Sequence, residues 1–435
     1  MRIALVSDCF MPRLGGIESQ VRDLALALQN NGHQVLVITA TPAQRGGGYS
    51  HDVVEGIRVL RLATPIFGGI PINPFCGRQL LAALQGADVV HINTGLVSPF
   101  AWHALLLAKL HTLPALVTWH SVLKPTVWPY IPFVRPITGP TIRHAAPSQL
   151  VAREVKQVVG QKGEVAVIPN GVSLRDWRQV ASWRLATRAS EPASESASTS
   201  TPEPAPESRS TQAPEPESAS AQETPQAPEP ASTPELAPET ETAPEQAKLL
   251  REQRRLRIIS ARRLAPRKRT LEMLEIVKAA REISGLDATL TIYGEGPQRW
   301  ELERWIRSHR AAKWVRLPGR ASRAELMQAY AQADIYLSSS RLESFGIATL
   351  EARAAGLPVV CPTNTGADDF LENEVSGLLG ESDQDVAAQL ARLLLDDELR
   401  GRIAHHNATT EPRENWELVT RLTEAEYRAA LRGTE

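Results

Sequence analysis

Residues 1–20 read MRIALVSDCFMPRLGGIESQ, and this stretch indicates the fold class. The apolar run at residues 3–6 has the length of a buried β-strand, and a helical pattern of apolar residues starts at Ile17. Gly15 and Gly16 stand directly before that helix, where glycines let a phosphate approach backbone N–H groups at the positive end of the helix dipole. Taken alone, a glycine pair is more typical of a simple tight turn.

The alternation of short β-branched runs with longer amphipathic runs continues to residue 178 and restarts after residue 250. Strands that alternate with helices predict a parallel, doubly wound sheet. A chain of 435 residues also exceeds one ordinary core, so we expect an α/β protein with domains at residues 1–178 and 251–410. The predicted strands are 3–6, 34–39, 57–62, 88–92, 115–119, 165–168, 257–261, 288–293, 334–338 and 358–361, and the predicted helices include 17–29, 100–110, 148–159, 271–282, 323–332, 346–355 and 386–395.

The composition changes sharply between the two domains. Residues 191–247 are Glu, Pro, Ala, Ser, Thr and Gln apart from Arg209 and Leu236, which predicts a disordered linker within residues 179–250. This stretch holds 12 Glu and one Arg, so 47 basic and 37 acidic residues lie outside it. The resulting excess of about ten positive charges favours anionic ligands or an anionic membrane face.

Cysteine usage and hydropathy bound the location of the protein. Cys9, Cys76 and Cys361 lie far apart and show no CxxC or Cys/His pairing, so we expect neither disulfides nor a zinc site, which fits a reducing cytoplasm. We expect no signal peptide, and no run of 18 apolar residues occurs, so any membrane contact is expected to be peripheral, on the inner face. Residues 65–76 and 123–140 mix apolar, aromatic and basic side chains that suit either a membrane interface or a buried acceptor pocket.

A dense cationic loop follows the predicted strand at residues 257–261. Open α/β sheets bind ligands at the carboxyl ends of their strands, where Arg263 and Lys268 suit a diphosphate. A solvated basic turn explains the same residues equally well. A nucleic-acid surface is the weaker interpretation, because no aromatic residues interleave with the charges.

Glu343 and Glu351 stand eight residues apart, at the start of a predicted helix and inside it. Eight helical residues rise about 12 Å, which is too far for both carboxylates to act on one bond. They suit two hydroxyl-bearing groups, a sugar ring and a ribose, at opposite ends of an extended ligand. Backbone N–H groups near Phe345 and Gly346 then face the middle of that ligand.

Three further features have common structural explanations. His120 ends a predicted strand, although an isolated histidine is more often structural than catalytic. Residues 294–297, Gly-Glu-Gly-Pro, read as an ordinary strand-to-helix turn. Asp383 and Asp385 imitate a metal-binding Asp-x-Asp pair, but they directly precede a helical pattern and favour helix capping, so we expect no metal.

Taken in order, these segments resemble glycosyltransferase family 4, the retaining enzymes of the GT-B fold, in which two Rossmann-like domains enclose a cleft. The resemblance is carried by residues 15–18, 118–120, 168–172, 263–268, 294–297 and 343–358, and it covers nearly all of the chain except the linker. It implies a nucleotide diphosphate sugar as donor, no cofactor, and a closing helix at residues 411–435 that packs back on the first domain.

The resemblance also implies a role for each candidate residue. Gly16, beside Gly15, faces the donor phosphates, Arg263 and Lys268 bind the diphosphate, and Leu317 lies near the base. His120 and Glu343 flank the transferred sugar, Glu351 binds the ribose, and the backbone at Phe345 and Gly346 meets sugar hydroxyls or phosphate. In such enzymes transfer is described as front-face, with the departing phosphate helping to deprotonate the acceptor.

The chain departs from the family pattern at Ser173, where Asp is common, at Arg269, where Gly often follows the Lys, and at residues 365–369, where Gly-Gly and a Glu are usual. Residues 8–19 resemble enzymes that glycosylate phosphatidylinositol or its mannosides with UDP-N-acetylglucosamine or GDP-mannose. The expected partners are therefore a nucleotide sugar and a lipid or glycan acceptor, with peripheral contact to anionic membrane and no nucleic acid. The alternatives are an inactive GT-B scaffold and a nucleotide-sugar epimerase or phosphorylase of similar architecture.

Overall fold

A computed structural model describes residues 1–13, 15–43, 48–64, 73–95, 97–123, 141–160, 164–190 and 255–433. The linker at residues 191–247 and most of the two apolar segments at 65–76 and 123–140 lie outside this part of the chain. No described helix is both long and apolar enough to cross a membrane.

The first domain contains an eight-stranded sheet in the order β3-β4-β2-β1-β5-β6-β7-β8. Its pairings are parallel, as the sequence predicts, except for the edge strand β3, which runs antiparallel to β4. Glu55 and Gly56 join these two strands, and both have positive φ (51° and 82°), which is the conformation of a tight hairpin turn. The strands are β1 (Arg2–Ser7), β2 (Gln34–Thr39), β3 (Tyr49–Val54), β4 (Ile57–Leu62), β5 (Val89–Thr94), β6 (Ala115–Trp119), β7 (Ile142–Ala146) and β8 (Val165–Val167).

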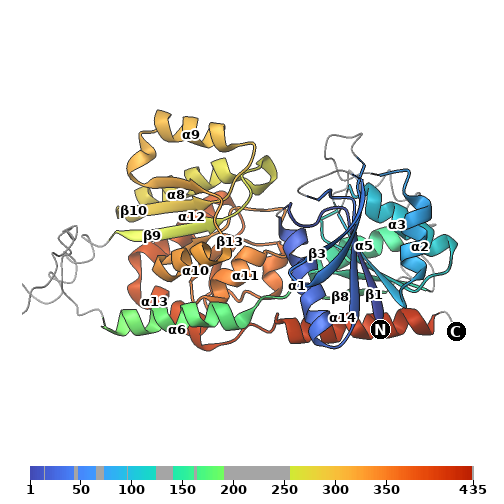
Figure 1. The fold of residues 1–435 in the computed structure, drawn as a ribbon. Helices are drawn as coiled ribbons and strands as arrows, with labels where there is room; N and C mark the ends of the chain where they lie inside the picture. The colour runs from blue at the N-terminus through green and yellow to red at the C-terminus, as the bar shows by residue number, and fades with distance from the viewer. Residues whose placement is uncertain are drawn as a thin grey trace, which may run out of the picture. The chain divides into compact units, whose positions relative to one another are not determined.

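Helices cover both faces of this sheet (Figure 1). On one face Leu80, Phe100 and Val155 pack against the strands, and they belong to α2 (Gly77–Gln85), α3 (Pro99–Leu110) and α5 (Gln149–Val159). On the other face Val21 and Tyr427 pack against the strands from α1 (Gly16–Asn30) and α14 (Trp416–Arg432). The apolar runs of the strands are thus buried on both sides, which is the arrangement that parallel sheets require.

The second domain contains a fully parallel sheet in the order β11-β10-β9-β12-β13-β14. It too is covered on both faces, so the prediction of two doubly wound α/β domains is confirmed. Its strands are β9 (Leu256–Ala261), β10 (Ala288–Tyr293), β11 (Val315–Gly319), β12 (Ile335–Leu337), β13 (Val359–Pro362) and β14 (Gly377–Gly380). Its helices are α8 (Thr270–Ser284), α9 (Arg299–Ser308), α10 (Arg323–Gln332), α11 (Ile347–Ala354), α12 (Asp383–Leu395) and α13 (Asp397–Thr409), with short 3₁₀ helices η4 (Pro266–Lys268), η5 (Ala311–Lys313) and η6 (Gly366–Asp369).

Helix α6 (Leu174–Ser190) precedes the linker but packs with the second sheet. Its fully buried Trp177 stacks at 5.2 Å on Tyr330, and Arg184 donates hydrogen bonds to the carbonyls of Tyr330 and Ala331 near the end of α10. Residue 178, where the sequence suggests the end of the first domain, therefore lies inside a helix whose packing continues beyond it.

Helix α14 is fixed to the first sheet by polar contacts as well as apolar ones. The hydroxyl of Tyr427 lies 2.8 Å from His91 Nδ1, and both side chains are buried. Burial lowers the pKa of His91 to about 3, so this ring is neutral at physiological pH. At the helix surface Arg143 pairs with Glu426 at 2.9 Å.

Replacing Tyr427 with Phe should leave one nitrogen of the buried His91 ring without a partner. An unsatisfied buried polar group costs about 1–3 kcal/mol, which should lower the melting temperature by several degrees. Tyr49→Phe is the matched control, because Tyr49 is 52% exposed. Equal melting temperatures for the two variants would show that the His91–Tyr427 contact does not stabilise the fold.

Candidate active site

Two predicted site residues meet at the carboxyl edge of the second sheet. Lys268 lies at the end of η4, in the loop after β9, and its Nζ is 2.5 Å from Glu343 Oε2. Each side chain is about one fifth exposed, at 20% and 19%. The two residues are 75 positions apart and three strands lie between them, and the parallel order of the sheet brings the two loops together. The pair offers a cation and an anion to the same ligand.

Arg262 supplies a second cation under this edge, and the sequence analysis did not single it out. It donates to Ser260 Oγ at 3.0 Å, to Ser339 Oγ at 2.7 Å and to the Lys268 carbonyl at 2.7 Å. Burial lowers the pKa of Arg262, but arginine stays charged because its ordinary pKa is so high. These hydrogen-bond partners are uncharged hydroxyls and a carbonyl, so the positive charge of Arg262 adds to the electrostatic potential at the site. Its guanidinium group also holds the loop of Lys268 through the bond to the Lys268 carbonyl.

The remaining predicted cation, Arg263, is exposed to solvent. Burial raises the pKa of the Cys9 thiol to about 11, and Arg263 is among the nearby charges that act on it. The exposed Gly16 begins α1, and a Cβ built on it would lie 3.6 Å from Ile347, the first residue of α11. These contacts bring the glycine turn after β1 close to the loops of Arg263 and Glu343.

Glycines allow these loops to interlock. A Cβ on Gly294 would lie 1.7 Å from the Arg262 carbonyl oxygen, and one on Gly296 would lie 2.1 Å from the Leu264 carbonyl oxygen. Backbone hydrogen bonds join the same segments, including Leu264 N–H to the Glu295 carbonyl at 3.0 Å. Residues 294–297 therefore do more than turn the chain, because their backbone supports the cationic loop.

A similar contact supports the loop of Glu343. A Cβ on Gly366 would lie 2.2 Å from the Ser344 carbonyl oxygen, and the same oxygen accepts a hydrogen bond from Ser148 Oγ at 2.7 Å. Gly346 caps α11 with φ of 96°, a conformation that glycine adopts without strain. The Phe345 side chain is buried, with its ring centre 5.1 Å from that of Phe370, so only its backbone is available to a ligand.

Arg269 stands where the family pattern often has glycine, yet the turn before α8 still forms. Its φ of 54° lies in the left-handed region, which favours glycine. The arginine side chain instead donates to Asp383 at 2.7 Å and pairs with Glu272 at 3.4 Å. These bonds offset part of the backbone strain.

Glu351 lies on α11, eight residues after Glu343, which precedes the helix. Burial raises the pKa of its carboxyl group to about 7, while Arg323 opposes that rise and Asp23 adds to it. Arg323 begins α10 and pairs with Asp176 at 3.4 Å. A carboxyl group poised between its two protonation states suits a binding site more than a solvated surface.

His120 follows β6, and its Nε2 is 2.9 Å from Asn93 Oδ1 on the neighbouring strand β5. Burial lowers the pKa of His120 to about 4, so the ring is neutral at physiological pH.

Asp8 directly follows β1. Burial raises the pKa of its carboxyl group to about 6, and the Phe100 N–H group donates a hydrogen bond to it at 2.9 Å. Asp8 thereby caps α3.

Leu317 lies on the edge strand β11, and its carbonyl accepts a hydrogen bond from Arg299 at 3.0 Å. Among the described residues no hydrogen bond or ion pair joins Leu317 to Lys268 or Glu343, so its place beside a base stays a prediction. Asp385 forms a capping box with Ser382 at the start of α12, which confirms capping as the reason for the Asp-x-Asp pair. No cluster of three or more metal-ligating side chains occurs among the described residues.

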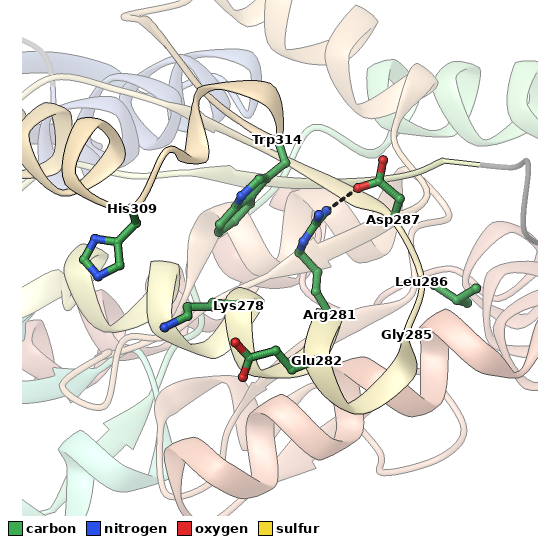
Figure 2. A pocket seen from close by; sticks show the side chains of 8 residues that line it. All are labelled: Lys278, Arg281, Glu282, Gly285, Leu286, Asp287, His309 and Trp314. Carbon is green, nitrogen blue, oxygen red and sulfur yellow. Dashed lines mark ion pairs between the residues drawn. The ribbon is translucent and has the colours of Figure 1, made fainter.

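A surface hollow elsewhere in the second domain is lined by paired charges (Figure 2). Arg281 pairs with Asp287 at 2.7 Å and lies 5.0 Å from the ring centre of Trp314. Asp287 and Trp314 directly precede β10 and β11, so this hollow lies at the amino ends of the strands. It is therefore at the opposite edge of the sheet from Lys268 and Glu343.

Solved structures define the class of protein. A sucrose-phosphate synthase from Thermosynechococcus elongatus is similar with a TM-score of 0.66 at 18% identity, over 98% of each chain. The Anabaena protein HepE in complex with UDP is similar with a TM-score of 0.66 at 16% identity, over 98% of this chain and 99% of that one. At these identities the likeness shows the fold, which is that of the GT-B glycosyltransferases.

The sequence comparisons then define the family. The model described as "Glycosyltransferase Family 4" matches residues 14–176, and that described as "Glycosyl transferases group 1" matches residues 242–409. The two matches cover the second sheet and all of the first sheet except β1, so the chain belongs to the glycosyltransferases that these two models describe.

Two curated relatives differ in how much of the chain they match. Glycogen synthase of Mycobacterium tuberculosis is 35% identical over 151 residues, which are 33% of this chain and 36% of that protein. The chain thus matches about a third of the length of that relative. The phosphatidylinositol N-acetylglucosaminyltransferase GPI3 subunit of Saccharomyces cerevisiae is 23% identical over 393 residues, covering 86% of this chain and 70% of that protein.

Because these loops lie so close together, one added methyl group at Gly296 should disturb them. Gly296→Ala should push the backbone of residues 262–268 away, because the added Cβ meets the Leu264 carbonyl at 2.1 Å. We expect a loss of about 1–3 kcal/mol in stability and weaker binding of a nucleoside diphosphate. Gly401→Ala is the control, because Gly401 lies in α13 with open space around its Cβ position and Ala favours helix. Similar melting curves and affinities for both variants would contradict the support role of Gly296.

Proposed function

We propose that the protein is a retaining glycosyltransferase that moves a hexose or an N-acetylhexosamine from a nucleotide diphosphate sugar to a hydroxyl acceptor. One observation carries the proposal most directly. The Lys268–Glu343 pair lies at the N-terminal end of α11, beside the backbone of Phe345 and Gly346. A cation for phosphate, a carboxylate for sugar hydroxyls and free helix N–H groups there match the three parts of such a donor.

The chemistry that these groups support is the departure of a nucleoside diphosphate. The bond between the anomeric carbon and the phosphate oxygen breaks as the acceptor oxygen bonds to that carbon from the same face. The acceptor proton passes to the departing phosphate. Lys268, Arg263 and the helix N-terminus stabilise the negative charge that develops on the phosphate, which is where such a site lowers the barrier.

Each candidate residue binds a different part of the nucleotide sugar. Glu343 binds the transferred sugar, Glu351 binds the ribose, and Leu317 lies near the base, with Gly15 and Gly16 facing the phosphates. His120 lies beside the reacting sugar. UDP-sugars and GDP-mannose are the candidate donors, and the solved HepE complexes with UDP and UDP-glucose support a nucleotide-sugar ligand for this fold. The reaction requires neither cofactor nor metal in this proposal.

The acceptor is a phosphatidylinositol-type lipid or a glycan. The relative named as a phosphatidylinositol N-acetylglucosaminyltransferase subunit supports a lipid, because it matches 86% of this chain. The excess of basic residues outside the linker supports peripheral contact with the anionic inner face of the cytoplasmic membrane.

A panel of radiolabelled nucleotide sugars, with and without membrane lipid extract, tests the function. Transfer of label to lipid or glycan supports the proposal, and conversion of the donor without any acceptor would identify an epimerase instead. A complete lack of turnover would favour an inactive scaffold.

Lys268→Ala and Arg263→Ala should each lower kcat/KM by an amount equivalent to about 2–5 kcal/mol, since each removes one partner of a charged contact with the donor. Arg267→Ala is the matched control, because it removes the same charge from the same exposed loop. Steady-state rates with a saturating acceptor measure the effect. If all three variants keep the wild-type kcat/KM, the diphosphate does not bind to this loop.

Glu351→Gln should remove a pH dependence of nucleoside diphosphate binding. The ribose hydroxyls need an ionised acceptor, and the pKa of Glu351 is about 7, so affinity should rise up to about tenfold between pH 6 and pH 8. Glu343→Gln should keep that pH dependence and slow transfer instead. Calorimetric titrations at both pH values measure this, and the same pH profile in wild type and Glu351→Gln would reject the ribose assignment.

Membrane contact should show in co-sedimentation with lipid vesicles. Binding should increase when anionic lipid replaces neutral lipid and decrease as salt screens the charges. Binding that responds to neither change would argue against electrostatic attachment.

A further inference from the structure

Asn93 holds the ring of His120 from inside the first sheet. Asn93 lies on β5 and is 4% exposed, and its Oδ1 is 2.9 Å from His120 Nε2. Its Nδ2 donates to the Val6 carbonyl at 3.4 Å. A carbonyl only accepts hydrogen bonds, so this contact fixes the amide with its nitrogen towards β1 and its oxygen towards His120.

The orientation of the amide decides which ring nitrogen carries the proton. Oδ1 of Asn93 only accepts, so His120 Nε2 must donate and therefore bears hydrogen. The low pKa of His120, about 4, keeps the ring neutral, which leaves Nδ1 unprotonated. The described residues form no hydrogen bond with Nδ1, and this atom is not one of the buried atoms without a partner. Nδ1 is thus the nitrogen available to a ligand.

We infer that Asn93 is a positioning residue, which holds His120 in the tautomer that presents Nδ1 as a hydrogen-bond acceptor to a hydroxyl of the sugar or of its acceptor. The inference rests on the proposed function, which puts His120 beside the reacting sugar. The opposite tautomer would present an N–H group at the same place and would reject a hydroxyl that needs to donate.

The neighbouring pair on the same two strands provides a comparison. His91 Nε2 lies 2.8 Å from Thr118 Oγ1, and His91 Nδ1 lies 2.8 Å from the Tyr427 hydroxyl. His91 and Asn93 project from one face of β5, and Thr118 and His120 from the same face at β6, because alternate strand residues share a face. The titratable groups next to His120 are thus His91 of β5 and, beyond it, Tyr427 of α14, and both are neutral.

The ring nitrogens of His120 can be read directly by NMR after ¹⁵N labelling of histidine. The chain has ten histidines, and a His120→Gln variant identifies the signals of this one. We expect wild-type protein at neutral pH to show a protonated Nε2 and an unprotonated Nδ1. In Asn93→Leu, which keeps the side-chain size but removes the acceptor, the signals should shift towards the other tautomer.

Kinetics of the same variants separate positioning from folding. Asn93→Leu should lower kcat about tenfold or more while leaving nucleoside diphosphate affinity within about twofold, as for a wrongly held catalytic tautomer. Thr118→Val is the matched control, because it breaks the neighbouring His91 contact and should leave the His120 signals unchanged.

Two results would overturn the inference. One is a wild-type protein in which His120 Nδ1 is protonated. This measurement does not depend on the folding of any variant. The other is an Asn93→Leu protein that keeps both the wild-type ring signals and the wild-type kcat. Failure of the proposed function is distinguishable, because it would appear as no transfer from any donor, while a protonated Nε2 read without substrate would still support the hold of Asn93 on His120.

Discussion

At the carboxyl edge of the second sheet, neighbouring loops approach so closely that hydrogen is the only side chain their glycines can carry. Gly294 and Gly296 face the backbone of the Arg262 loop, and Gly366 faces the backbone of Ser344. Backbone contacts of this kind are fixed by the parallel strands from which the loops emerge, so they do not depend on flexible side chains. The position of Lys268 relative to Glu343 is therefore set by the sheet itself, which is the support that a preorganised ligand site needs.

The charges at this edge fall into two groups with different tasks. Lys268 and Glu343 satisfy each other while both remain partly exposed, so a ligand can reach the pair and offer each group a new partner. Arg262 is held by hydroxyls and a carbonyl, and none of its hydrogen-bond partners among the described residues is a carboxylate. Its position does not depend on the Lys268–Glu343 pair, and in the proposed reaction a fixed positive charge under the departing diphosphate would be the preorganised electrostatics that favours transfer.

The sequence predicts the parts of this structure that follow from local pattern. Buried parallel strands such as β1 and β9 read as apolar runs, and the sequence also marks Lys268 and Glu343 as candidate ligand residues, which the structure brings into contact. Strands β3, β7, β11 and β14 were not predicted. β3 alternates exposed and half-buried residues at an edge, and β7 contains Arg143 and His144. β11 contains a proline and a glycine, and β14 begins and ends with glycine. The residues that sequence reasoning missed, Arg262 and Asn93, act through partners 2 to 87 residues away, and spacing along the chain carries no signal of such contacts.

Asn93 nevertheless breaks a pattern that the fold makes informative. All six residues of β5 are buried, yet His91, Asn93 and Thr94 are polar. Polar groups in a strand covered on both faces destabilise it unless they are paired, so their presence requires partners on the adjacent elements. For His91 and Asn93 those partners are Tyr427 of the closing helix, Thr118 and His120, while the Thr94 hydroxyl donates to the Gly95 carbonyl. One polar layer thus serves both the docking of α14 and the orientation of His120, and the folded state is stabilised by the same hydrogen bonds that prepare the ring for a ligand.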